Sequence, residues 1–524
     1  MSDLFNNLIH LFTYDPSQPM IFSSGFFLWL FFGFAFVYMK LRKRPIARLL
    51  FVTLFSYFFY YKSSGHYFFL LAIVTVSDFF LAKAIARHRA RKEAREESGE
   101  ENGSMDTAGT AIAGIQTPKQ GLNIAKALVA LSLIIDLGLL FYFKYTNFFA
   151  GMWSAMVGNN FQPWDIFLPV GISFFTFQSL SYTIDVYRGK IKPLNSLLDY
   201  AFYVSFFPQL VAGPIVRASD FIPQIRQPLK ITREMFSRGL YFIIIGLFKK
   251  AVISDYISLN FVDRIFDDPS LYTGIENLLG LYGYAIQIYC DFSGYSDMAI
   301  GIALLLGFRF PMNFNAPYKA ESISDFWRRW HISLSSWIRD YVYISLGGNR
   351  CKKWRQYFNQ WFTMTLCGLW HGAAFNYVIW GMTHGIATAF HKYWRSERCH
   401  HDKHYHSKGW RRVGASLLTF HFVLLTWILF RNTSYDNIMA QFHQLFTQLH
   451  PELLFQVIAG YPMVFVMIGI GMLSHFLPDR WQDTIIATLG KCNIAVCALA
   501  LTAVIYLVIQ VKSSDIQPFI YFQF

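Results

Sequence analysis

Apolar segments of about helix length, separated by short basic runs, recur along almost the whole sequence. The first covers residues 21–39 and is followed by four basic residues within 40–44, and another covers 67–86 and is followed by five within 87–95. Such segments become stable when they span a bilayer, where each helix needs about 20 apolar residues. The 54% hydrophobic and 15% charged content is also rare among soluble proteins. We therefore predict an all-α polytopic membrane protein with roughly ten to twelve transmembrane or partial helices, and residues 1–524 in one transmembrane domain.

The basic residues indicate how the chain is oriented in the membrane. A net charge of +14 would also suit nucleic acid, but Lys and Arg stand between apolar segments, as in cytoplasmic loops. We expect no nucleic-acid partner, an N-terminus outside, and the basic loops in the cytoplasm. Residues 88–121 are rich in Glu, Gly, Ser, Thr and Ala, and have few large apolar residues to bury. This stretch is predicted to be a disordered cytoplasmic linker.

The apolar segments in the middle of the chain are short and interrupted. Pro169, Gly171, Pro208, Gly213 and Pro214 break them. Broken helices at membrane depth are tolerated where protein or a water-filled cavity covers the freed backbone groups. We therefore expect re-entrant segments in this region, and we expect them to line a cavity.

Two aspartates, Asp291 and Asp297, lie within the apolar segment 278–307. Carboxylates inside a membrane need partners or water. They could form the polar lining of a reaction chamber, or they could cap a helix break or pair with an arginine such as Arg309. The sequence favours neither interpretation, so neither aspartate is included among the catalytic residues.

Residues 311–356 are predicted to form an amphipathic segment on the cytoplasmic side. Within it, Trp327, Trp330, Leu334 and Trp337 recur at spacings of three or four, which predicts an amphipathic helix over 325–343. Anchoring at the membrane interface would explain most of these tryptophans. His331 follows Trp330 directly and could point into the interior of the protein.

A second histidine, His371, stands between Gly368 and Gly372 in an apolar run. Basic residues mark both flanks of this run as cytoplasmic, so it must cross an even number of times. We predict two short helices that meet at depth, with His371 near the break. The glycines could relax a turn or allow close helix packing, and the two interpretations are compatible. Burial favours the neutral imidazole, which is the form that a general base requires.

Other catalytic signatures are missing from the sequence. It contains no Gly-x-Ser-x-Gly elbow, P-loop, dinucleotide fingerprint or His-Glu-x-x-His motif. The four histidines between 400 and 406 could bind a metal, but they lie in a Lys- and Arg-rich loop. We favour a solvated loop and expect no metal site.

Four segments together resemble a known family. Residues 206–217 (FFPQLVAGPIVR), 291–301 (DFSGYSDMAIG), 325–340 (DFWRRWHISLSSWIRD) and 369–372 (LWHG) are similar to the bacterial membrane-bound O-acyltransferases (MBOAT). The branch indicated is that of the alginate O-acetyltransferases, with the D-alanyl transferase of teichoic acid synthesis as a relative. The resemblance extends over about 167–394. It implies an MBOAT-like core with a central tunnel or funnel, in which His371 is catalytic and His331 is the second catalytic histidine.

The resemblance also implies a reaction. An acyl group, which we expect to be acetyl, would move from a cytoplasmic thioester to a hydroxyl on an extracytoplasmic polysaccharide or lipid-linked glycan. The setting would be the bacterial inner membrane, with a periplasmic acyltransferase as a further partner. Acetyl-CoA or another acyl thioester would be a co-substrate, and no bound cofactor is expected. The residues predicted to bind substrates are Arg328, Arg329, Trp330 and Asp340, although membrane topology is an alternative reason for the basic ones.

Two alternatives remain open at this point. The acyl or D-alanyl donor could be delivered by a carrier protein that docks on the cytoplasmic face. The broken helices could instead belong to a transporter or a scaffold without catalysis.

Overall fold

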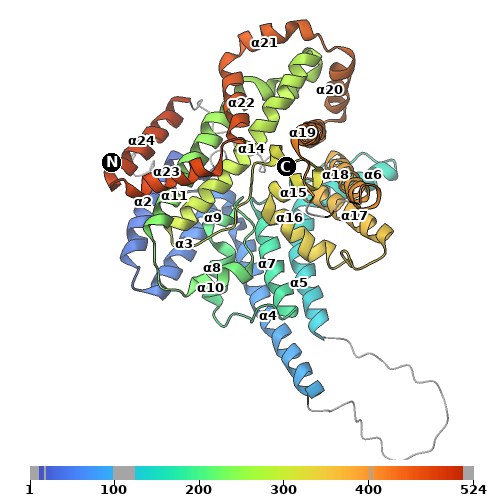
Figure 1. Cartoon of the computed structure of the whole chain (residues 1–524). Helices are drawn as coiled ribbons and strands as arrows, with labels where there is room; N and C mark the ends of the chain where they lie inside the picture. The colour runs from blue at the N-terminus through green and yellow to red at the C-terminus, as the bar shows by residue number, and fades with distance from the viewer. Residues whose placement is uncertain (1–10, 17–18, 98–123, 401, 403–404, 512–524) are drawn as a thin grey trace, which may run out of the picture.

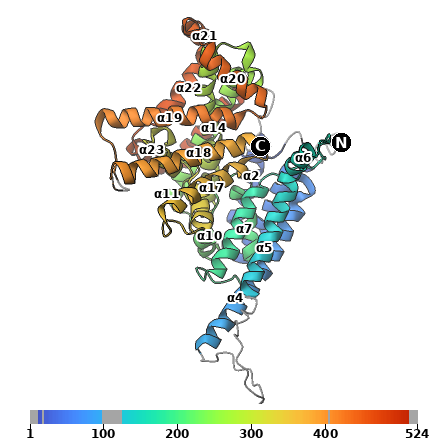
Figure 2. The ribbon, with the colours of Figure 1, turned by 90° about the vertical axis from the view of Figure 1, so that its right-hand side faces the viewer.

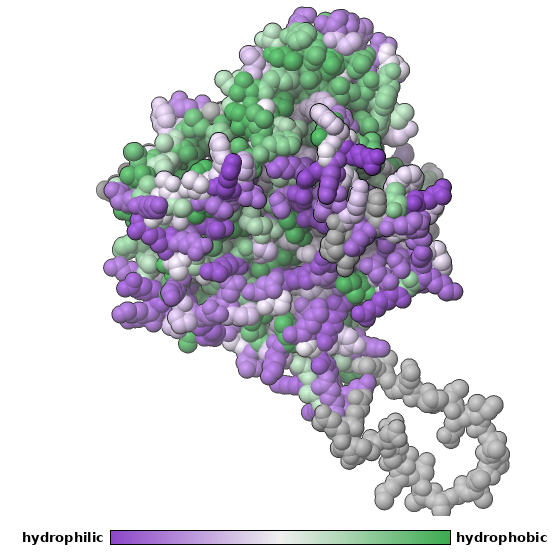
Figure 3. All heavy atoms as spheres, viewed as in Figure 1, coloured by the Kyte–Doolittle hydropathy of each residue, from purple (hydrophilic) through white to green (hydrophobic). Residues whose placement is uncertain are grey.

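The computed structural model describes residues 11–16, 19–97, 124–400, 402 and 405–511. Over these residues every regular element is helical and no strand is formed, which confirms the expected all-α fold (Figure 1). Large apolar side chains are exposed on the outside, among them Trp29 at 79% and Phe455 at 80%. Figure 3 shows hydrophobic residues gathered on the surface around α21 and α22. A hydrophobic surface of this kind is expected where a protein contacts lipid.

The first five helices pack along one side of the molecule. They are α2 (Gly25–Lys40), α3 (Pro45–Ser64), α4 (Phe68–Glu97), α5 (Ile124–Leu140) and α6 (Thr146–Met156), with short turns at η1 (Gly65–Tyr67) and η2 (Phe141–Tyr145). The apolar segments predicted at 21–39, 49–61, 67–86 and 122–143 each coincide with one of these helices.

The predicted linker begins later than the sequence indicated. Helix α4 continues to Glu97, so residues 88–97 are helical rather than disordered. The arginines, lysines and glutamates of this stretch are good helix formers, and Arg89 and Glu93 form an ion pair of 2.7 Å one turn apart. The rest of the predicted linker, residues 98–121, lies outside the described residues.

The middle of the chain consists of short elements, as expected from its prolines and glycines. They are α7 (Ile172–Tyr187), α8 (Leu197–Ser205), α9 (Phe207–Leu210), α10 (Ala218–Ile225), α11 (Arg233–Leu247), η3 (Phe248–Ser254), α12 (Asp255–Ile257), η4 (Ser258–Val262), α13 (Asp263–Asp267) and η5 (Pro269–Leu271). Almost every residue of α7 is buried. Residues 202–216 are buried as well, so the backbone breaks on both sides of α9 are enclosed by protein.

A single long helix, α14 (Gly274–Leu305), crosses the centre of the molecule. Its 32 residues extend about 48 Å at 1.5 Å per residue. It packs so closely on α11 that a Cβ atom at Gly246 would lie 2.6 Å from the Gly294 carbonyl oxygen. Small residues at such a contact let helices approach backbone to backbone.

The two aspartates of α14 form ion pairs with consecutive lysines of η3, a π-helical turn. Lys250 Nζ lies 2.6 Å from Asp291 Oδ1, and Lys249 Nζ lies 2.7 Å from Asp297 Oδ2. Ion pairing, one of the two interpretations left open by the sequence, is therefore confirmed, with lysines as partners rather than an arginine.

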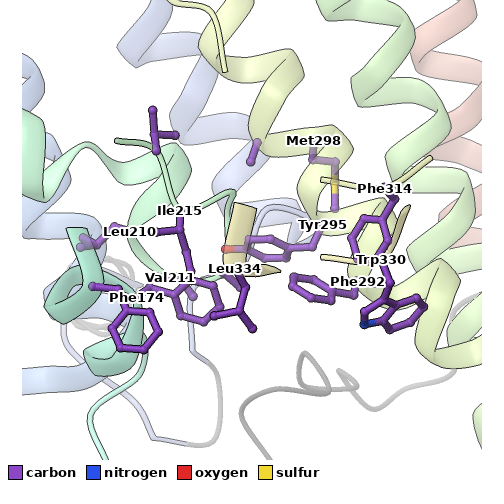
Figure 4. Close-up of a cluster of buried hydrophobic side chains, with 14 of the residues drawn as sticks. Phe174, Leu210, Val211, Ile215, Phe292, Tyr295, Met298, Phe314, Trp330 and Leu334 are labelled. Atoms are coloured by element: carbon purple, nitrogen blue, oxygen red, sulfur yellow. The ribbon is translucent and has the colours of Figure 1, made fainter. Parts of the chain in front are cut away.

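The stretch 325–343 does not form the single amphipathic helix that its spacing predicts. After η6 (Pro317–Lys319), it is divided into α15 (Ile323–Arg329), α16 (Ile332–Ile338) and η7 (Arg339–Tyr343). The tryptophans are 9% (Trp327), 1% (Trp330) and 5% (Trp337) exposed, so interfacial anchoring is wrong for all three. The aromatic side chains of this segment fill the protein core, where Trp330 and Leu334 lie beside Phe292 and Phe314 (Figure 4).

The remaining elements complete the bundle. They are α17 (Lys353–His371), α18 (Phe375–Tyr393), η8 (Trp394–Arg398), α19 (Gly409–Arg431), α20 (Tyr435–Thr447), η9 (Pro451–Leu453), α21 (Leu454–Gly460), α22 (Pro462–Ser474), α23 (Asp479–Lys491) and α24 (Ile494–Val511). Figure 2 shows α17, α18 and α19 side by side, at a steep angle to α4 and α5. The apolar run 453–476 is bent by 97° between α21 and α22. Pro462 at this bend cannot continue a helix.

The roughly ten to twelve helices expected include partial ones, so full-length spans are a subset of them. Within the described residues, three helical stretches are long and apolar enough to cross a membrane, 45–94, 124–156 and 409–431, and the bent pair would make a fourth. The first stretch includes the turn η1, so it consists of two helices. Two shorter helical stretches, 25–40 and 494–510, are also apolar.

Candidate active site

His371 is the last residue of α17, at the turn into α18. Gly372 adopts an extended conformation and ends the helix, and a Cβ atom there would collide with the Tyr377 ring. Gly368, one turn earlier, lies against Gly381 of α18. Both interpretations of the glycine pair are confirmed, because Gly372 makes the turn and Gly368 allows the close packing. Two helices of 19 residues each meet at His371, as predicted, whereas their depth in the membrane stays a prediction.

The imidazole of His371 is 2% exposed and surrounded by aromatic rings. Ring centroids lie 4.9 Å away for Trp370, 5.3 Å for Trp380 and 5.2 Å for Phe430. A polar ring buried in such an apolar setting costs a few kcal/mol unless it has partners.

One side of His371 faces a small cavity of about 50 Å³. Its lining consists of residues 168–174 together with Lys144, Val211, Trp370 and His371. The middle of the chain therefore lines a cavity, as its prolines and glycines predict. Such a volume admits a hydroxyl group or a few water molecules but no sugar ring.

The orientation predicted from the basic loops places this cavity near the outer side. Lys144 lies just beyond the end of α5 that is remote from Ile124, and the backbone N–H of Val170 donates to Ser64 Oγ at 2.9 Å, beside the turn between α3 and α4. Both positions are at the ends of helices whose other ends carry the basic residues.

His331 lies in the break between α15 and α16 and is fully buried. Its backbone has φ +43°, a left-handed conformation that is uncommon for a residue with a side chain. The backbone N–H of the next residue, Ile332, donates to the Asn313 carbonyl at 2.9 Å, which holds this turn in place. Strained backbone of this kind is often found at functional sites.

Trp370 lies between the two histidines. Its ring centroid is 6.0 Å from that of His331 and 4.9 Å from that of His371. Phe174 of α7 packs on the same tryptophan at 5.7 Å and on His331 at 6.4 Å. The structure thus brings together the two histidines that the sequence singles out, in one aromatic cluster formed by three parts of the chain.

A second and larger cavity, of about 770 Å³, lies beside α15 and the C-terminal end of α18. Three arginines, Arg328, Arg395 and Arg411, line it together with aromatic residues such as Trp394 and Phe422. Arg328 is therefore the one of the four predicted substrate-binding residues that lines this cavity. The others have partners within the protein.

Arg329 forms an ion pair of 2.9 Å with Asp325, and Trp330 packs on Phe326 with ring centroids 5.5 Å apart. Asp340 lies 2.6 Å from Arg217 and 2.6 Å from Arg339. Burial alone would raise the pKa of Asp340, but the hydrogen bonds from both arginines hold it below its ordinary value. A role for these three residues in substrate binding stays a prediction.

A wall of aromatic residues separates the two cavities. Phe422 lines the larger cavity and contacts His384 at 5.5 Å, His384 contacts Trp380 at 4.6 Å, and Trp380 contacts His371. Trp327 Nε1 donates to His384 Nδ1 at 3.3 Å, and His384 Nε2 lies 3.0 Å from Thr426 Oγ1. These bonds assign the imidazole proton of His384 to Nε2.

Lys144 and His384 were not predicted from the sequence. A lysine and a histidine within apolar segments are the signal that could have identified them, since ionisable groups at membrane depth are usually functional. Among the described residues, no group of three or more His, Cys, Asp or Glu side chains could hold a metal ion. Of the predicted solvated histidine loop, His406 pairs with Glu321, and part of the loop lies outside the described residues.

The sequence matches the family model of the membrane-bound O-acyltransferases (MBOAT) over residues 190–428. This range includes both histidines and α14, but not Lys144. A probable alginate O-acetylase of Pseudomonas putida is 36% identical over 435 residues, which cover 79% of this chain and 86% of that protein.

Two further relatives have other acceptors in their names. The peptidoglycan O-acetyltransferase of Helicobacter pylori is 39% identical over 59% of this chain and 62% of its own length. The teichoic acid D-alanyltransferase of Bacillus subtilis is 31% identical over 51% of this chain and 70% of its own length. The resemblance stated from the four sequence segments is therefore confirmed.

Proposed function

Because the chain belongs to the membrane-bound O-acyltransferase family and is an O-acyltransferase, we propose that it acetylates hydroxyl groups of an extracytoplasmic polysaccharide. The donor is acetyl-CoA on the cytoplasmic side of the bacterial inner membrane. The relatives named as alginate and peptidoglycan acetylating enzymes support the acetyl group and the polysaccharide. The observation that carries the proposal is the position of His371, at a helix end and on the wall of a cavity.

His371 acts as the general base in this proposal. The acceptor hydroxyl enters the small cavity from the outer side and gives its proton to the imidazole as its oxygen attacks the thioester carbonyl carbon. A new C–O bond forms, the C–S bond breaks, and the thiolate leaves. A thiolate of ordinary pKa, near 8.5 as in cysteine, needs little protonation to depart.

The oxyanion of the tetrahedral intermediate requires hydrogen-bond donors. His331 is the first candidate, because its ring and that of His371 both pack on Trp370, with centroids 6.0 Å and 4.9 Å away. The indole N–H groups of Trp370 and Trp380 are further candidates, since they are buried and make no hydrogen bond within the described part of the chain. Direct transfer fits this arrangement better than a covalent enzyme intermediate, since the sequence places no serine or cysteine in a recognisable activating context.

The larger cavity is the proposed donor site. Its volume is typical of sites for ligands of nucleotide size, and Arg328, Arg395 and Arg411 supply positive charge for phosphates. The acyl-bearing arm must then pass the wall of Trp380 and His384 to reach His371. We propose that these side chains move when the donor binds. A periplasmic acyltransferase that receives the acetyl group and completes the transfer is a further proposed partner.

The proposal is tested by the sidedness of the reaction. The purified chain is reconstituted in liposomes, sorted by orientation, and given acetyl-CoA with a labelled acetyl group on one side and an oligosaccharide acceptor on the other. Ester formation is expected only when acetyl-CoA is on the face that carries Arg328. The proposal would be contradicted if ester formed only when acetyl-CoA and the oligosaccharide were on the same face of the membrane.

The second candidate function uses a carrier protein as donor, as the similarity to the teichoic acid D-alanyltransferase suggests. The exposed basic residues of 350–355 would then contact an acidic carrier. If this alternative is correct, ester forms in the liposome assay only with an acylated carrier protein as donor, and free acetyl-CoA is not consumed.

A further inference from the structure

Two consecutive residues outside the family match donate hydrogen bonds to the end of the helix that carries His371. Lys144 Nζ lies 2.7 Å from the Trp370 carbonyl oxygen and 2.8 Å from that of His371. The Tyr145 hydroxyl donates to the Leu369 carbonyl at 3.0 Å. Three consecutive carbonyls of α17 are therefore bound by two adjacent side chains from the turn η2 at the end of α5.

These carbonyls need donors because of the way α17 ends. The last four carbonyls of a helix have no partner within it, and a glycine in left-handed conformation usually brings the following N–H groups to them. Gly372 is instead extended, with φ −158° and ψ 151°. Lys144 and Tyr145 replace this local cap, and a cation at a helix C-terminus also interacts favourably with the helix dipole.

The same lysine touches the aromatic cluster between the histidines. Its ammonium lies 5.9 Å from the centroid of the Trp370 ring, and its side chain lines the small cavity with His371. Lys144 thus contacts the backbone of both residues of the Trp-His pair, the ring of the first, and the cavity that the second faces.

We propose that Lys144 and Tyr145 are positioning residues that hold the imidazole of His371 against the acceptor cavity. This inference rests on the proposed role of His371 as general base. The turn η2 is π-helical, and such turns are frequent at functional sites because they redirect neighbouring side chains. Here the turn coincides with the two residues that reach α17 together.

The test compares acetyl transfer by Lys144→Met, Lys144→Arg and Tyr145→Phe in liposomes. The matched controls are Lys83→Met, which removes a lysine that donates to the Asn195 carbonyl at 3.1 Å far from His371, and Tyr142→Phe, which alters an exposed ring. A small displacement of a catalytic group can cost about 100-fold in rate. We therefore expect Lys144→Met to lower kcat by about 10- to 100-fold, with the KM for acetyl-CoA unchanged.

Lys144→Arg keeps donors for the carbonyls and is expected to recover most of the lost kcat, whereas Tyr145→Phe loses one hydrogen bond and has a smaller effect. The inference would be overturned if the Lys144→Met variant had the same kcat as the Lys83→Met control. If Lys144→Met does not fold, the test depends on Tyr145→Phe. The inference is then overturned if Tyr145→Phe has the same kcat as Tyr142→Phe. An active His371→Ala variant would refute the proposed function instead, whatever the Lys144 variants do.

Discussion

Gly368 of α17 and Gly381 of α18 touch backbone to backbone. A Cβ atom at Gly368 would lie 2.8 Å from the Gly381 Cα, and one at Gly381 would lie 2.9 Å from the Gly368 Cα. Real Cβ atoms do not approach other atoms so closely, and backbone cannot move aside as a side chain can. This contact sets the spacing of the two helices that meet at His371.

Substituting either glycine should therefore separate the helices. We expect Gly368→Ala to destabilise the protein by about 1 to 3 kcal/mol, the usual cost of overpacking, and to lower acetyl transfer in the protein that remains folded. Thermal unfolding in detergent and the transfer rate measure the two effects. Gly138→Ala is the control, because no atom lies within 4 Å of a Cβ there. Equal stability of the two variants would show that the contact is not important.

The buried pair of Lys249 and Asp297 should be structural. Lys249→Met leaves a carboxylate without its partner at 2.7 Å, in a site where the Asp297 side chain is 9% exposed. Removal of one member of a buried ion pair costs about 3 to 5 kcal/mol. We expect a large fall in stability that Asp297→Leu, added to the first change, partly reverses. A variant that keeps its stability but loses activity would support the alternative, a polar lining of the reaction chamber.

Arg328 should act on the donor alone. Because it lines the larger cavity and is exposed, Arg328→Ala is expected to raise the KM for acetyl-CoA several-fold and leave kcat unchanged. The difference from the parent protein should shrink at high salt, where exposed charges are screened. Arg226→Ala, which removes an arginine bound to Asp199 at 2.7 Å, is the control. An unchanged KM would remove Arg328 from the donor site.

The sequence predicts the helices of this fold well where hydropathy is simple. Uniform apolar segments such as 67–86 and 122–143 coincide with α4 and α5. The turn at His371 was also predictable, since Gly368 and Gly372 bracket a polar residue in an apolar run. Both histidines were identified by motifs of the family and by their unusual setting.

Other features depend on contacts between distant parts of the chain. The spacing of Trp327, Trp330 and Trp337 fits one amphipathic helix, but the core they fill is closed by α7, α14 and α19, and the helix breaks at His331. The partners of Asp291 and Asp297 are lysines in a π-helical turn, which has no recognisable sequence pattern. The contacts of Lys144 with α17 were not predicted, because they form only when the turn η2 meets the end of that helix.

The central claim is that the His371 imidazole takes the proton of the acceptor hydroxyl, and the most direct test is the acetyl-transfer rate of His371→Ala in liposomes. General-base catalysis contributes about 10²- to 10⁴-fold, so the rate should fall by at least about 100-fold while the melting temperature stays close to that of the parent. His475→Gln, which alters a buried histidine packed on Tyr289 at 4.3 Å, should keep its activity. Acetyl transfer by a folded His371→Ala variant at the parental rate would contradict the account.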